Sequence, residues 1–345
     1  MLGERGMSQA ELSLRLGRTQ KNLSEIISGK AQITAELALE LEHVLGAPAS
    51  FWNNREARYR EALVRNKRYE LSQADIEWVK AFPYRVLVNS GLLPAAKATE
   101  AKYEQLLRFF GVADREAFNA WQASAVARYR RSLATKPQTD LLIAAWLREG
   151  ERQATEIRSG MYSAAEFESA IRYARTLTCM SPDEFLPLLK SRFQQAGVVL
   201  LLVPELPAMG VSGATRWLGQ KPVIQVTFRY KTTDQFWFTM FHESCHILRH
   251  PKRAVFLETN AQSHDATEAE ANRFAADLLI PPSAYDQLIG RRAFTRQAIG
   301  EFATGIGVCP GIVVGRLQRD GQISYSHFND LKVKFQPSNR PRPKP

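Results

Sequence analysis

The chain has 345 residues, of which 45% are hydrophobic and 23% are charged, as expected for a globular protein of two or three domains. No apolar run approaches the roughly 18 residues of a membrane span, which excludes a membrane partner. The formal net charge of +11 favours an anionic partner. Three Cys at positions 179, 245 and 309 predict no disulfide framework, so we expect a cytoplasmic protein.

Residues 8–30 predict two short helices joined by a tight turn. Ser8 can cap the first helix, with Glu11 completing a capping box, and Gly17 allows the turn. The second helix is expected to start near Thr19 and to end at Gly29. The two helices would share an apolar core formed by Leu12, Leu16, Leu23, Ile26 and Ile27.

The start of the second helix carries polar side chains that suit DNA, namely Arg18, Thr19, Gln20, Lys21 and Asn22. In a helix-turn-helix such residues reach base edges and phosphates. The stretch resembles the XRE-type helix-turn-helix, more closely its HigA-like antitoxin branch, and residues 33–46 and 48–59 are similar to that branch's next two helices. The resemblance implies a DNA-binding domain over residues 1–68 whose first helix is truncated, since only seven residues precede the motif.

The charge of this domain leaves a second interpretation open. Residues 1–66 contain nine Lys or Arg and eight Asp or Glu, a net balance of +1. That is small for binding driven by phosphate contacts. Operator binding through residues 8–30 therefore competes with a domain used for dimerisation or for docking a repressor.

Residues 69–190 predict an all-helical middle domain without a chemical motif. Apolar residues recur at helical spacing over 101–110, 115–133, 139–155 and 163–179. We expect the aromatic side chains in these helices to pack a core, and the surface could supply the contact of a homodimer.

Residues 191–335 predict a mixed domain. A buried strand is expected over 197–203, and a second over 222–230, where apolar residues alternate. The hairpin 210–230 could bind an extended substrate backbone. The predicted fold class is therefore mainly α with a small mixed β-sheet (α+β). The tail 336–345 is basic and rich in Pro, and is expected to be disordered.

An apolar helix over residues 238–250 contains His242, Glu243 and His246 in an HExxH pattern. Residues four apart lie on one helix face, so two imidazoles can converge on one Zn²⁺, while the Glu can activate the attacking water. His250 lies about 12 Å along the helix from His242. It is therefore too far away to join the same ion, and we expect a loop or substrate-side role, or none.

The third ligand should come from the helix over 267–281. Its apolar stripe consists of Ala271, Phe274, Ala275, Leu278 and Leu279. Glu268 lies at the edge of this stripe and is the candidate ligand, whereas Glu270 projects toward solvent. Asn272, one turn after Glu268, is a candidate partner for a ligand. For both Glu the alternative is a charge favourable to the helix N-terminus.

HExxH followed by EAEANRFAADLLIP resembles the ImmA/IrrE family of bacterial zinc metallopeptidases over about residues 190–335. The resemblance implies a gluzincin-like endopeptidase with Zn²⁺ held by His242, His246 and Glu268, and with Glu243 as the catalytic base. It also implies a protein substrate, an XRE-type repressor of stress-response, mobile-element or toxin-antitoxin genes. The alternative is an XRE-type transcriptional regulator or antitoxin whose zinc site is a sensor or structural.

Overall fold

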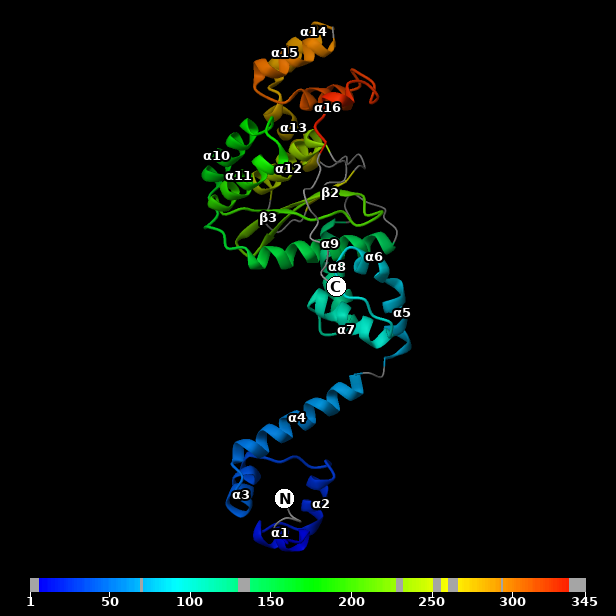
Figure 1. Ribbon diagram of the computed structural model, residues 1–345, viewed down its shortest axis with the longest axis vertical. Helices are drawn as coiled ribbons and strands as arrows, with labels where there is room; N and C mark the ends of the chain where they lie inside the picture. Colours follow the sequence, from blue (N-terminus) through cyan, green and yellow to red (C-terminus); the bar gives the residue numbers. More distant parts are fainter. Residues whose placement is uncertain are drawn as a thin grey trace. The chain divides into compact units, whose positions relative to one another are not determined.

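A computed structural model describes residues 6–68, 71–129, 137–227, 232–250, 256–259, 266–292 and 294–334, with only the backbone described at 66–68, 124–129, 137 and 256–259. The contacts divide the chain into two compact units, Met1–Ala74 and Asp75–Pro345, which are described separately (Figure 1). The tail predicted at 336–345 and the first five residues of the predicted 1–68 domain lie outside the described residues, as do residues 69–70 at its boundary.

Over its described residues 6–68, the first unit is a small helical domain with α1 (Gln9–Arg15), α2 (Gln20–Ile27), α3 (Ala35–Leu45) and α4 (Ala49–Arg68). A hydroxyl caps each of the first three, since Ser8, Thr19 and Thr34 each accept a hydrogen bond from the backbone N–H three residues on. The core consists of Leu12, Leu16, Leu23, Leu37, Leu41 and Leu45. The two helices predicted over residues 8–30 are therefore present.

The second unit is built on a four-stranded sheet in the order β1-β3-β2-β4. Its strands are β1 (Val199–Leu202), β2 (Val211–Leu218), β3 (Lys221–Val226) and β4 (Phe256–Thr259). β1 pairs with β3 in parallel, and the other two pairs are antiparallel. The predicted fold class, mainly α with a small mixed sheet, is confirmed. The hairpin of β2 and β3 is internal to the sheet, because β4 covers the outer side of β2; its predicted role as a substrate-binding edge is therefore wrong.

Both faces of the sheet are buried. Successive side chains of a strand point to opposite faces, so Val199 and Leu201 of β1 enter one core while Leu200 enters another. α9 (Pro137–Glu156) covers the first face, and α12 (Thr233–Arg249) packs on the second (Figure 1).

The first face carries α5 (Gln73–Ala81), α6 (Tyr84–Asn89), α7 (Thr99–Phe110) and α8 (Arg115–Tyr129), together with α9. α9 is bonded directly to the sheet, because Trp146 Nε1 donates to Val203 O at 3.2 Å and Gln225 Nε2 donates to Trp146 O at 2.7 Å. These helices share one core with three strands, so they are not a free-standing layer.

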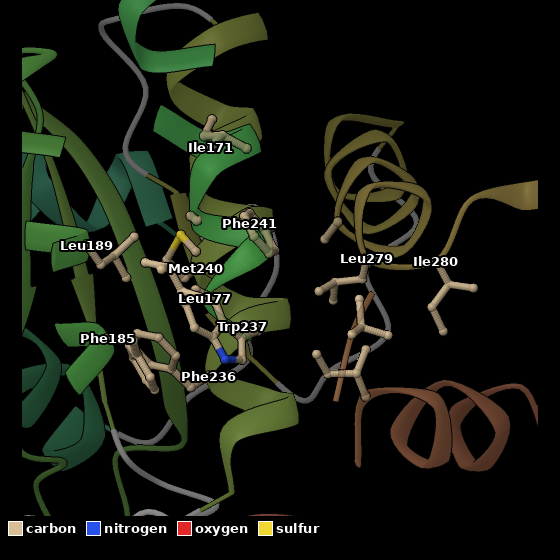
Figure 2. Close-up of a cluster of buried hydrophobic side chains, with 14 of the residues drawn as sticks. Ile171, Leu177, Phe185, Leu189, Phe236, Trp237, Met240, Phe241, Leu279 and Ile280 are labelled. Atoms are coloured by element: carbon tan, nitrogen blue, oxygen red, sulfur yellow. The ribbon is translucent and has the colours of Figure 1, made fainter. Parts of the chain in front are cut away.

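The second face carries α10 (Ala164–Thr176), α11 (Pro182–Gln195), α12, α13 (Ala266–Leu279), α14 (Pro282–Gly290), α15 (Arg296–Ile306) and α16 (Pro310–Arg319). Figure 2 shows Trp237 of α12 beside Phe185 of α11, and their ring centroids are 4.6 Å apart. The helices predicted as a middle domain over 69–190 thus divide between the two faces. The described residues show no boundary at residue 190, because α10 and α11 share this core with α12.

No single helix among the described residues combines the length and apolar composition needed to cross a membrane; α15 and α16 reach that composition only together, as a pair bent by 112°.

Candidate metal centre

The HExxH segment lies on α12, which is buried along almost its whole length. Phe236, Trp237 and Met240 anchor one side of the helix in the core of the second face. The opposite side carries His242 and His246, each 1% exposed, toward α13. A helix that is apolar around most of its surface must be buried, so α12 holds these polar side chains inside the fold.

Three side chains converge between α12 and α13. His242 Nε2 lies 3.1 Å from His246 Nε2, and the carboxylate oxygens of Glu268 lie 3.2 Å from the first nitrogen and 3.6 Å from the second. Ligand atoms that share one tetrahedral zinc ion are about 3.3 Å apart. The two imidazole nitrogens and one carboxylate oxygen, all within 4.8 Å of one another, therefore fit a single metal ion.

The surroundings of His246 favour its neutral imidazole. Burial, together with the smaller effects of the neighbouring His242 and His250, lowers the pKa of His246 to about 2. A metal ligand must be the deprotonated ring. His246 is thus already in the form that can bind a cation.

Asn272 lies where the sequence predicted a partner for a ligand. Its Oδ1 is 3.1 Å from His242 Nδ1 on the far side of the ring from the converging nitrogens. The same oxygen accepts a hydrogen bond from Arg319 Nη2 of α16 at 3.1 Å. Sequence reasoning missed Arg319, which is 47 residues away along the chain and reaches the site only through the tertiary fold.

Glu270 is turned away from the three converging side chains and is 44% exposed. Its Oε1 accepts from Arg249 Nη1 at 2.9 Å, and its Oε2 lies 3.3 Å from His250 Nε2. His250 also lies outside the group of three, but its ring is buried against His246, with 2.7 Å between the two Nδ1 atoms. Sequence reasoning missed this contact.

Glu243 is fully buried between α12 and β2. Thr215 Oγ1 of β2 donates to the Glu243 backbone carbonyl at 3.0 Å, so the strand is bonded to the helix at this residue. The next residue but one, Cys245, is also fully buried, and burial raises the pKa of its thiol to about 12. This environment favours a packing role for Cys245 over a reactive thiol.

The five predicted DNA contacts have different surroundings in the first unit. Arg18 is engaged within the domain, because its Nε and Nη2 bind the two carboxylate oxygens of Glu40 on α3 at 2.9 and 3.1 Å. Thr19 is the N-cap of α2 and accepts from Asn22 N, and Asn22 is half-buried. Gln20 and Lys21 are exposed on the first turn of α2.

Two imidazoles one helical turn apart, with a carboxylate from the next helix, define the site as metallopeptidase-like. Residues 195–317 match the family model of the IrrE N-terminal-like domain of peptidase family M78, and residues 1–52 match a helix-turn-helix model. The chain thus joins a peptidase domain to a DNA-binding-type domain and has the architecture of the ImmA/IrrE family, as its motifs predicted. The comparison with curated proteins found no match.

Proposed function

We propose that this chain is a zinc-dependent endopeptidase of the cytoplasm, with His242, His246 and Glu268 as metal ligands. The main support for the proposal is that one potential ligand atom of each of these three side chains lies within 4.8 Å of the other two. Two nitrogen donors and one carboxylate are a ligand set of catalytic zinc, which keeps its fourth position for water or substrate.

The chemistry would be hydrolysis of a peptide bond. A bound zinc ion would lower the pKa of a water molecule and polarise the scissile carbonyl. Glu243 would accept a proton from the attacking water as the new C–O bond forms, and would deliver a proton to the leaving nitrogen as the C–N bond breaks. The products are a carboxylic acid and an amine. Burial of Glu243 against β2 supports this role, because a held carboxylate loses little freedom at the moment of reaction.

The proposed substrate is an XRE-type repressor. The domain at residues 1–52 is itself of the helix-turn-helix type, which supports a role in bringing the peptidase to operator DNA or to a similar repressor. The exposed Gln20 and Lys21 at the start of α2 support DNA contact, while the small net charge of residues 1–66 favours protein docking.

The test compares wild type, Glu243→Gln and the matched control Glu168→Gln, which removes an exposed carboxylate of the Glu168–Arg172 ion pair on α10. Each protein is incubated with XRE-type repressors and with a mixture of synthetic peptides, and its zinc content is measured. Wild type and the control should cleave, whereas Glu243→Gln should lose about 100- to 10,000-fold in rate with zinc retained. Equal rates would refute Glu243 as the base. Zinc without cleavage in wild type would favour a regulator whose zinc is a sensor or structural.

A further inference from the structure

We propose that His250 and Glu270 form a relay that fixes the ring of His246 for metal binding. The inference rests on the proposed function, since it concerns how one ligand of the proposed zinc site is positioned. It gives a role to the two candidate residues near the motif that the proposed ligand set leaves out. His250 is the C-terminal cap of α12, and its backbone N–H still donates to His246 O at 3.2 Å.

The direction of each hydrogen bond in the relay follows from Glu270, the residue farthest from the proposed metal site. Glu270 accepts from Arg249 Nη1 at 2.9 Å, and an ionised carboxylate can only accept. His250 Nε2, at 3.3 Å from the other carboxylate oxygen, therefore carries the proton and donates. A neutral imidazole has one N–H and one acceptor nitrogen, so His250 Nδ1 must accept.

The acceptor on His250 then determines the tautomer of His246. The two Nδ1 atoms are 2.7 Å apart, so His246 donates its Nδ1–H to His250. The proton of His246 is thereby held on Nδ1, and Nε2 presents its lone pair toward His242 Nε2 and Glu268. Outer partners of this kind fix both ring orientation and tautomer of a ligating His.

A second chain of hydrogen bonds acts on His242 in the same way. Arg319 can only donate, so its contact at 3.1 Å requires that Asn272 presents its oxygen, and that oxygen then accepts from His242 Nδ1. Both Nε2 atoms are thus directed at the same point by partners on different elements. Glu270, two residues after Glu268, contacts His250 and lies outside the group of three converging side chains.

The experiment replaces His250 with Leu, which cannot accept, and with Gln, whose Oε1 can accept from His246 while its amide donates to Glu270. Long-range ¹H–¹⁵N spectra of the metal-free full chain report the His246 tautomer, and zinc affinity is measured by competition with a chelator. Wild type and His250→Gln should show the Nδ1–H form of His246. His250→Leu should lose that preference and bind zinc about 10- to 100-fold more weakly.

Glu270→Ala is the second variant, because Glu270 is 44% exposed and its removal leaves the core intact. It should reduce the Nδ1–H population of His246 and weaken zinc binding in the same direction as His250→Leu. An Nε2–H form of His246 in metal-free wild type, or unchanged zinc affinity in both His250→Leu and Glu270→Ala, would overturn the relay. The tautomer is read without metal, so failure of wild type to bind zinc would count against the proposed function alone.

Discussion

Gly213 of β2 lies directly against Glu243 of α12: a Cβ at position 213 would stand 2.7 Å from Glu243 Oε1. The strand pairing shifts register between Val211 and Gly213, which places an irregularity of β2 at this contact. The glycine is needed here for close approach of strand and helix. The backbone of β2 therefore forms one wall around the proposed catalytic carboxylate.

Replacing Gly213 with Ala should displace the Glu243 carboxylate and lower kcat by about 10- to 100-fold, because misplacing a catalytic group by about 1 Å can cost 100-fold. Zinc content should stay at the wild-type level. The matched control is Gly300→Ala on α15, where a Cβ would meet nothing within 4 Å and activity should not change. Wild-type kcat in Gly213→Ala would show that this contact does not hold the base.

The stability of the metal-free protein should fall in mild acid because of His246. Its folded-state pKa is about 2 against an ordinary value of 6.5. Between pH 2 and pH 6.5, His246 is therefore protonated in the unfolded chain but neutral in the folded one. The contribution of neutral His246 to the free energy of unfolding is complete above pH 6.5. It is lost as the pH falls toward 2, by up to about 1.4 kcal/mol per pH unit.

Urea unfolding of the metal-free chain at several pH values between 7 and 5 measures this slope. A His246→Asn variant, which has no group titrating there, should show a slope smaller by up to about one proton per molecule. Identical slopes for the two proteins would mean that His246 titrates normally in the fold.

Arg18 should act on the stability of the first unit more than on DNA affinity, because both of its bonds to Glu40 lie within the domain. Arg18→Ala and Glu40→Ala should each lower the free energy of unfolding by about 0.2–1 kcal/mol, and the double variant should lose no more than the larger single effect.

Lys21→Ala should weaken binding to duplex DNA more than Arg18→Ala does. Fluorescence anisotropy measures these affinities. A larger loss of DNA affinity in Arg18→Ala than in Lys21→Ala would indicate that Arg18 contacts DNA.

Deleting residues 1–68 should separate docking from chemistry. If the first unit brings the peptidase to its substrate, the deletion lowers the cleavage rate of the intact repressor but spares a short peptide that spans the scissile bond. The contacts define the first unit as compact by itself, so its removal leaves the core of the second unit in place. Equal rates on the intact repressor with and without residues 1–68 would leave a peptidase with an independent DNA-binding domain.

The parts of the fold that follow local rules could be predicted from the sequence. The helices α1, α2 and α12 have clear apolar periodicity and hydroxyl or motif signals at fixed spacing, so their positions and the approach of His242 to His246 were predictable. Glu268 was predictable as well, because the apolar stripe of α13 determines which face of that helix turns inward.

The remainder depends on long-range contacts that no local pattern reports. The short strand β4 is recognised only by its pairing with β2. Glu40 binds Arg18, which is 22 residues away along the chain, and Glu270 contacts His250, which is 20 residues away. The position of α9 against the sheet likewise depends on bonds such as that between Trp146 and Val203, 57 residues apart, so periodicity alone indicated a separate helical domain.

The metal content of two matched variants, Glu268→Gln and Glu270→Gln, tests directly whether His242, His246 and Glu268 are the zinc ligands. Each substitution removes one charge from the first turns of α13 and keeps the side chain's shape. We expect about one zinc per chain in wild type and in Glu270→Gln, whose amide oxygen can still accept from His250, and a large loss of zinc in Glu268→Gln. Zinc retained by Glu268→Gln and lost from Glu270→Gln would contradict the proposed ligand set.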